Sequence, residues 1–114
     1  MRIKLLMLSV FFLAAGTGTA AAFNECSIFS DRRYQGTNIA LGAGRSIPNL
    51  KRYKMNDKIS SIEINDSRCR LEVWEHPNYK GRYADIRSNI SRLTRWNGWK
   101  LEDEISSLRC SCRK

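Results

Sequence analysis

The sequence is poor in histidine and has no long run of basic residues. A single histidine, His76, occurs in 114 residues, which excludes a histidine-rich metal site. A Ser-His-Asp hydrolase also lacks support, because that chemistry needs a base positioned beside its nucleophile. The basic residues occur in small groups such as Arg32-Arg33, and not in the run of five or more that is typical of a nucleic-acid-binding tail. We therefore expect neither an enzyme nor a nucleic-acid-binding protein.

Long hydrophobic runs are absent apart from one near the start. Arg2 and Lys4 precede an apolar stretch over residues 5–15, and small residues follow as far as Ala22. This order is that of a secretory signal peptide, and the apolar stretch is too short to span a bilayer core of about 30 Å. We therefore expect residues 1–22 to be removed before Phe23. The product is expected to be secreted or periplasmic, without a transmembrane segment.

Removing 22 of the 114 residues leaves 92, residues 23–114, which are expected to form one small basic domain. Loss of Arg2 and Lys4 lowers the formal net charge from +9 to +7. Net charge concerns partners and solubility, not fold. The surplus is ordinarily a solvated cationic surface. The functional alternative is attraction to an anionic cell-envelope polymer or to a target protein.

Four cysteines are present, and their number limits the possible disulfides. A domain of this size buries only about two thirds of its unfolded surface, so covalent links help to stabilise it. Export places the thiols in an oxidising compartment, where disulfides persist. The pair Cys110-Ser111-Cys112 has one residue between its cysteines, whereas zinc motifs typically have two to four. Two disulfides are therefore expected, and four cysteines allow three pairings.

A motif of two aromatic residues and a glycine occurs twice. The first copy runs from Phe29 to Gly36 and the second from Trp74 to Gly81, an offset of 45 residues. An Ile-Ser-Ser triplet follows each motif, with Ser61 and Ser107 at an offset of 46. Repeats of this length usually mean that one copy cannot bury its apolar face alone. The two copies are therefore predicted to pack as one paired unit.

Strand signals dominate both copies. Segments such as Ile62-Glu63-Ile64 alternate apolar and polar residues with a period of two, and glycine and asparagine turns separate them. No helix of three turns is indicated, although 51–55 and 95–101 could each hold a helical turn. Eight short antiparallel strands predict an all-β, two-sheet sandwich. The expected strands are 25–30, 37–42, 45–50, 59–65, 69–75, 82–87, 89–94 and 104–110.

The repeated aromatic motif has a physical explanation as a folded hairpin. Two rings five residues apart can cover a turn, while the glycine takes a backbone conformation that a Cβ disfavours. Tyr34 and Tyr79 are then scaffold residues and not ligands. The hydroxyls of Ser61 and Ser107 can reach the folded hairpin. Each serine is expected to tie the last strand of its copy to the first.

These features resemble the βγ-crystallin family over Cys26 to about Cys112. The resemblance implies one domain of two Greek-key motifs, at about 25–66 and about 69–112. Calcium-binding members carry six residues of the type Asn/Asp, Asn/Asp, any, any, Ser/Thr, Ser. The segment Asn56 to Ser61 matches fully, and Glu102 to Ser107 departs only in having Glu102 at its first position.

The resemblance implies two shared calcium sites, each using the loop of one copy and the folded hairpin of the other. Calcium takes six to eight oxygen ligands, which loops of this kind can supply. Side-chain oxygens are expected from Asp57 with Ser60 and from Asp103 with Ser106. Backbone carbonyls are expected from Lys58, Glu104, Ser30 and Glu75.

The expected strand order also suggests how the cysteines pair. If the first and last strands of a copy are antiparallel neighbours, Cys69 at a strand start lies near Cys112 at the chain end. Cys26 is then left for Cys110. The period-two alternation places all four on the same face as apolar neighbours such as Leu71 and Leu108, toward the core.

A segment rich in tryptophan and arginine is not explained by the repeat. Trp96 and Trp99 lie among Arg92, Arg95 and Lys100. Aromatic rings bury large areas, so these can close one end of the sandwich. An exposed patch could instead bind a partner, as in a cationic secreted effector such as a protease inhibitor or antimicrobial protein. The leading expectation is a non-enzymatic calcium-binding domain whose fold calcium stabilises, with the effector as the alternative.

Overall fold

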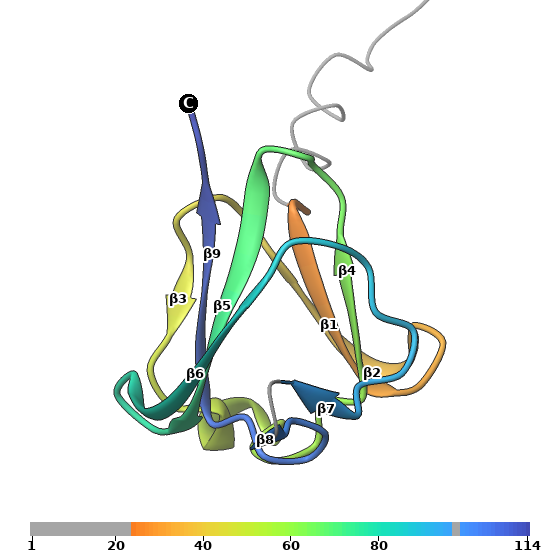
Figure 1. Cartoon of the computed structure of the whole chain (residues 1–114), viewed down its shortest axis with the longest axis vertical. Coiled ribbons are helices and arrows are strands. Elements are labelled where there is room, and N and C mark those ends of the chain that lie inside the picture. Colours follow the sequence, from red (N-terminus) through yellow and green to blue (C-terminus); the bar gives the residue numbers. More distant parts are fainter. Residues whose placement is uncertain (1–23, 97–98) are drawn as a thin grey trace, which may run out of the picture.

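The computed structural model describes residues 24–96 and 99–114, which form two antiparallel sheets that face each other (Figure 1). The first copy contributes β1 (Cys26–Asp31), β2 (Gln35–Leu41), β3 (Ser46–Ile47), a 3₁₀ turn η3 (Leu50–Tyr53) and β4 (Ser61–Ile64). The second copy contributes β5 (Cys69–His76), β6 (Lys80–Ile86), β7 (Arg95–Trp96), β8 (Trp99–Lys100) and β9 (Ser107–Cys112). The predicted all-β sandwich is confirmed.

The two copies exchange their third strands. One sheet has the order β2-β1-β4 and the other β3-β9-β5-β6, so β3 of the first copy lies in the sheet of the second. In return, Ile90 of the second copy bridges to Ile62 on β4. The first and last strands of each copy are antiparallel neighbours, as expected. Because each sheet needs a segment of the other copy, the copies form one paired unit.

The third strand of each copy is shorter than the sequence pattern predicts. β3 has two residues in place of the expected 45–50, and the expected strand 89–94 is reduced to the bridge at Ile90. The possible helical turn at 51–55 is a 3₁₀ turn over Leu50–Tyr53. The possible helical turn at 95–101 is not found, because Arg95 and Trp96 pair with Lys100 and Trp99 as two short strands. These segments are fixed by contacts with the other copy or by a tight local pairing, which periodicity does not encode.

The core lies between the two sheets and draws on both copies. Inward residues of β1 and β5, such as Ile28, Leu71 and Val73, are fully buried. We call the two six-residue segments 56–61 and 102–107 the hexapeptides. Ile59 and Ile105, at equivalent positions of the two hexapeptides, are also fully buried. Burying side chains of this kind contributes roughly 1.5–3 kcal/mol each. The hexapeptides are therefore anchored in the core, and their polar residues are held at its edge.

Both aromatic motifs fold as the sequence predicts. The rings of Phe29 and Tyr34 meet edge to face at 5.7 Å, and those of Trp74 and Tyr79 at 5.1 Å. Tyr34 and Tyr79 have left-handed backbones with φ of 61°, and the glycines that follow have φ of 83° and 84°. Such backbone values are rare outside glycine, asparagine and aspartate. Each hairpin is therefore folded back on itself.

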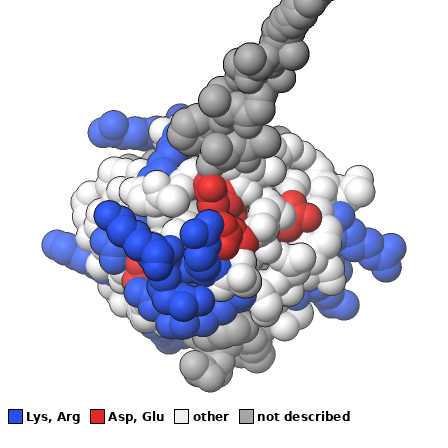
Figure 2. All heavy atoms as spheres, turned by 90° about the horizontal axis from the view of Figure 1, so that it is seen from above, with Lys and Arg blue, Asp and Glu red and all other residues white. Residues whose placement is uncertain are grey.

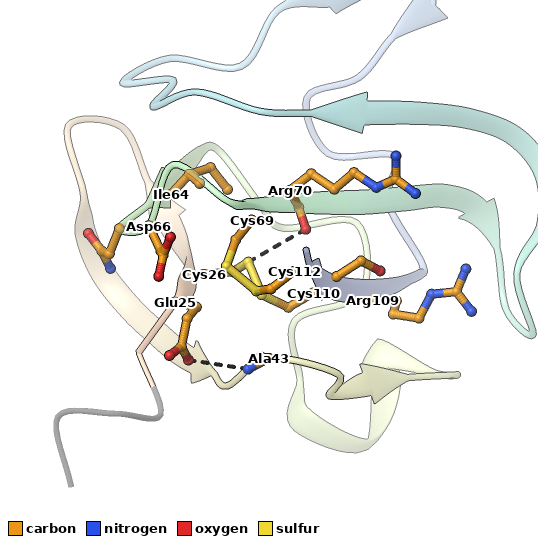
Figure 3. Close-up of a disulfide and its surroundings, with 12 residues drawn as sticks. Glu25, Cys26, Ala43, Ile64, Asp66, Cys69, Arg70, Arg109, Cys110 and Cys112 are labelled. Atoms are coloured by element: carbon orange, nitrogen blue, oxygen red, sulfur yellow. Dashed lines mark hydrogen bonds between the residues drawn. A yellow bond between two sulfur atoms is a disulfide. The ribbon is translucent and has the colours of Figure 1, made fainter. Parts of the chain in front are cut away.

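Two disulfides close the end of the sandwich opposite η3 and the β7–β8 pair. Cys26 is bonded to Cys110, which joins the two sheets, and Cys69 to Cys112, which joins neighbouring strands. This is the pairing that the expected strand order suggests. Figure 3 shows the two bonds side by side between β1, β5 and β9. Within the described ranges, no helix is long and apolar enough to cross a membrane.

Candidate metal centre

The two hexapeptide loops lie against each other at the edge of the core. The backbone N–H of Asp57 donates to the carbonyl of Ile105 at 3.0 Å, and that of Asp103 donates to the carbonyl of Ile59 at 3.4 Å. Asp57 and Asp103 both have left-handed backbones, with φ of 56° and 62°. Each aspartate is therefore held on the loop of the other copy, and this arrangement repeats across the pair.

The fifth-position serines lie on the hairpins of their own copies. The N–H of Ser60 donates to the carbonyl of Phe29, and the N–H of Ser106 donates to the carbonyl of Trp74, both at 2.9 Å. The hydroxyl of Ser106 lies 3.4 Å from a carboxylate oxygen of Asp57. One candidate donor set thus combines Asp57 of the first copy with Ser106 and the Glu75 segment of the second.

Equivalent backbone bonds occur on the other side of the pair. Asp103 is held on the Ile59 carbonyl and Ser60 on the Phe29 carbonyl, so Asp103, Ser60 and Ser30 correspond to Asp57, Ser106 and Glu75. The sequence assigned both the aspartate and the serine of each site to one loop. The structure instead brings Ser106 of the second copy to Asp57 of the first, with Lys58 and Glu104 following the two aspartates.

A shallow hollow of about 270 Å³ lies at the first donor set. Several carboxylates line it without meeting as one cluster among the described residues. Burial together with the neighbouring charges of Glu102 and Asp57 raises the pKa of Asp103, against the opposing effect of Lys100 and Arg32. A cation placed there would relieve this repulsion. The hollow is lined by Asp57, Glu75, His76, Asp103, Glu104 and Ser106.

The final serines of the triplets serve the fold and not the hollow. Ser61 is fully buried, donates to the carbonyl of Asp31 at 2.6 Å and accepts from the N–H of Tyr34 at 3.0 Å. Ser107 makes the same two bonds to His76 and Tyr79, at 2.7 and 3.0 Å. Each serine therefore ties the last strand of its copy to its folded hairpin, as predicted.

The first positions of the two loops differ in their contacts. Asn56 donates to Asp57 at 3.0 Å, and its own side-chain oxygen is buried without a partner among the described residues. At the second loop, Glu102 forms an ion pair of 3.3 Å with Arg32, on the hairpin of the first copy. The repeat could not reveal this contact of Arg32, because the equivalent residue in the second copy is Pro77.

The donor chemistry fits calcium better than a transition metal. Within 24–96 and 99–114, no three histidine, cysteine, aspartate or glutamate side chains lie together as a metal cluster. Apart from the His76 imidazole, the side chains that line the hollow are carboxylates and the Ser106 hydroxyl, all of them oxygen donors. Calcium accepts such ligands in flexible geometry and completes its shell with water. The residues present therefore suit a calcium ion bound partly through backbone and water.

Of the two tryptophans in the segment not explained by the repeat, Trp99 is buried. Trp99 is 4% exposed, and its indole N–H donates to the carboxylate of Glu104 at 2.8 Å. Trp99 therefore closes the bottom of the sandwich, behind the second hexapeptide. The side chain of Trp96 lies outside the described residues.

Comparison with known proteins agrees with the fold. A family model described as Beta/Gamma crystallin matches residues 25–111. Among solved structures, a βγ-crystallin domain from Flavobacterium johnsoniae shares 26% identity, with a TM-score of 0.64 over 79% of this chain and 97% of that chain. A search of the curated proteins found no match.

Two further solved structures share the fold at lower identity. A βγ-crystallin from Ciona intestinalis has 20% identity and a TM-score of 0.60, over 77% of this chain and 98% of that chain. A βγ-crystallin domain from Clostridium beijerinckii has 20% identity and a TM-score of 0.62 over the same shares. With a family match over most of its length and a sandwich of two interlocked Greek keys, the chain belongs to the βγ-crystallin family.

Proposed function

We propose that this protein is an exported, non-enzymatic βγ-crystallin domain that binds calcium and is stabilised by it. The observation that carries the proposal is the approach of Ser106 to Asp57, at 3.4 Å, across the boundary between the two copies. The two side chains lie 49 residues apart in the chain, so this oxygen pair exists only in the folded state. Export is supported by the N-terminal sequence and by two disulfides.

Calcium bound at this boundary would stabilise the fold by mass action. A ligand that binds only the folded chain adds about 2.7 kcal/mol at a hundred times its dissociation constant. Each donor set draws on both copies, so the ion would link the two Greek keys. In a small domain this is a substantial part of the 5–15 kcal/mol that folded proteins commonly have.

The two sites should differ in strength. In the set with Asp57, Ser106 and Glu75, the aspartate comes from the fully matching hexapeptide, 56–61. The side-chain oxygen of Asn56, which has no partner among the described residues, belongs to the residue next to Asp57. The set with Asp103 has the Arg32 guanidinium nearby, held by Glu102. A fixed cation weakens a divalent site by Coulomb repulsion. We therefore assign the stronger site to Asp57 and the weaker one to Asp103.

The test is thermal unfolding of the oxidised chain with calcium and with a chelator. Calcium is expected to raise the midpoint by several degrees, since 1 kcal/mol corresponds to about 4–8 °C in a domain of this size. Asp57→Ala and Ser106→Ala should each remove most of this shift, and the double variant should lose little more than either. Asp103→Ala should remove a smaller part.

Asp66→Asn is the matched control, because it removes a carboxylate remote from the hexapeptides and should leave the calcium shift intact. Titration calorimetry on the same variants separates binding from stability. Absence of heat at millimolar calcium in the unmodified chain would refute the metal proposal. If Ser60→Ala and not Ser106→Ala abolished the stronger site, the crossed assignment would be wrong.

The alternative function, a cationic effector, gains no aromatic support from Trp99. Trp99 is buried and bonded to Glu104, so it cannot anchor a partner. The basic surface still supports that function.

A further inference from the structure

Arginines line a groove at the end of the molecule opposite the hexapeptides. The groove has a volume of about 310 Å³ and lies where β5 begins and β6 and β9 end. We call it the arginine groove. Its lining residues are Ser67, Arg68, Cys69, Arg70, Arg87, Ser111, Cys112 and Arg113.

The fold places like charges directly opposite each other across this groove. Cys69 pairs with Cys112, and the backbone bond from Arg113 to Arg68 at 2.9 Å extends that ladder by one residue. Leu71 of β5 pairs with Ile86 of β6 in an antiparallel register. Continuing this register by one residue places Arg70 opposite Arg87. Opposed like charges on neighbouring strands are destabilising. The Cys69–Cys112 disulfide holds Arg68 and Arg113 in this arrangement.

Nearby carboxylates offset only part of this charge. Asp66 binds Arg68 at 2.8 Å, and Asp85 binds Arg87 at 2.9 Å and Arg70 at 3.5 Å. Glu72 also lies 3.8 Å from Arg70. These carboxylates lie outside the groove, whose described lining holds no acidic residue. A guanidinium has five N–H donors, so each arginine can bind an external anion as well. Figure 2, viewed from this end, shows lysines and arginines gathered into a patch with a few acidic residues beside it.

The arginine side chains remain well hydrated. The side chains of Arg68, Arg70 and Arg87 are 61%, 38% and 64% exposed. A single small anion would bind weakly at such open positions, because exposed ion pairs contribute only about 0.2–1 kcal/mol each. Several contacts made along one chain would add through effective concentration. The groove therefore favours an extended polyanion over a single phosphate or sulfate ion.

The lining also discriminates among polyanions. Single-stranded nucleic acid is usually held by aromatic side chains on which bases stack, and the described lining of the groove has none. It offers instead guanidiniums, which bind phosphate and sulfate groups in a bidentate manner, and the hydroxyl of Ser67. These groups suit a polymer whose recognisable features are oxyanions and sugar hydroxyls.

We propose that the arginine groove is a binding site for a sulfated or phosphorylated polysaccharide. The site lies at the opposite end of the sandwich from the hexapeptides, and it does not depend on calcium. The ligand bridges the opposed pairs Arg68 with Arg113 and Arg70 with Arg87. Binding fixes the domain to an anionic cell-envelope or extracellular polymer while leaving the metal centre exposed.

The test measures binding of the oxidised chain to a sulfated oligosaccharide of defined length, in chelator, by titration calorimetry. Replacing Arg68, Arg70, Arg87 and Arg113 together by glutamine should weaken binding more than tenfold and flatten its salt dependence. The matched control replaces Lys51, Arg52, Arg82 and Arg92 by glutamine. These four exposed cations do not line the groove, so this variant, with the same net charge, should bind within about threefold of the unmodified chain.

Arg113→Gln is the second variant, because no ion pair of its side chain is recorded in the described structure and its loss should not disturb folding. It should weaken binding about two- to fivefold, in line with one exposed ion pair. Equal loss in the groove variant and its control would overturn the proposal, since binding would then follow net charge alone. Equal affinity for a single-stranded oligonucleotide would overturn the choice of polysaccharide. A calcium-binding failure would leave this result unaffected.

Discussion

At the residue scale, the two most deeply placed hydroxyls hold the two hairpins in place. Ser61 and Ser107 are fully buried, and each bonds both a carbonyl and an N–H of its own folded hairpin. Removing a buried hydroxyl leaves two backbone groups unpaired, which costs about 1–3 kcal/mol per group. The serines therefore matter for stability whether or not calcium binds.

We expect Ser61→Ala and Ser107→Ala each to lower the free energy of unfolding by about 2–4 kcal/mol, as measured by chemical denaturation in chelator. Ser88→Ala, at an exposed position, is the control and should change it by less than about 0.5 kcal/mol. If the two buried serines behaved like Ser88, their hydroxyls would not be tying hairpin to strand.

A buried carboxylate on β5 should make stability depend on pH. Burial raises the pKa of Glu72, but hydrogen bonds from Arg109, Ser111 and Tyr83 outweigh burial and lower that pKa from 4.5 to about 2. The folded-state pKa thus lies below the unfolded one, so ionised Glu72 contributes stability above pH 4.5. That contribution is lost as the pH falls from 4.5 to about 2.

Stability measured by denaturation between pH 7 and pH 2 should therefore fall through this window by a few kcal/mol on account of Glu72. Glu72→Gln should be less stable at neutral pH and show a flatter acid profile. Glu63→Gln, on β4 of the other sheet, should keep the original profile. A Glu72→Gln profile parallel to that of the unmodified chain would show that another group is responsible.

At the scale of elements, the aromatic hairpins require glycine for space as well as for conformation. At Gly36, φ is 83°, and an added Cβ would lie 2.3 Å from the Ser30 hydroxyl and 2.7 Å from the Asp31 carboxylate. At Gly44, φ is 84°, but nothing lies within 4 Å of an added Cβ. The two positions therefore separate backbone strain from crowding.

Gly36→Ala should be destabilised by about 2–4 kcal/mol and Gly44→Ala by about 1–2 kcal/mol, as measured by denaturant unfolding. The difference between them reports the clash with Ser30 and Asp31. Equal destabilisation would mean that the hairpin opens to admit a Cβ at no cost, and the folded hairpin would then not be rigid.

Element types were predictable where the pairing is local or regular. β1, β2, β5 and β6 lie close to their expected ranges, because alternation reports a half-buried strand directly. The third strands were not predicted well, because β3 and Ile90 pair with the other copy. The segment 95–101 was misassigned because its two short strands pair only with each other. A hydrophobic pattern indicates which residues are buried, but it does not identify the segment that packs against them.

At the scale of the whole molecule, the two disulfides constrain different parts of the fold. Cys26–Cys110 closes a separation of 84 residues and joins the two sheets, whereas Cys69–Cys112 closes 43 residues and joins strands already paired. On the chain-entropy account these loops correspond to about 4.5 and about 4 kcal/mol. The inter-sheet bond also has no backbone ladder to replace it.

The Cys26→Ala, Cys110→Ala variant should therefore lose about 3–5 kcal/mol and the Cys69→Ala, Cys112→Ala variant about 2–4 kcal/mol, measured by denaturant unfolding. Native peptide mapping of the unmodified chain is the control for connectivity. Greater loss on removing Cys69–Cys112 would mean that the chain end, and not the sheet interface, limits stability.

The sequence by itself determined the repeat, the all-β class, the hairpins and the oxygen-rich hexapeptides, because these depend on residue type and spacing along one segment. Only the tertiary structure decided which serine meets which aspartate. Ser106 joins Asp57 because the copies are interlocked, so that each aspartate lies on the other copy's loop and each serine on its own hairpin. The tertiary structure also places four arginines from three strand ends in one groove. Spacing along a chain cannot express such contacts, since they arise only when distant segments share a surface.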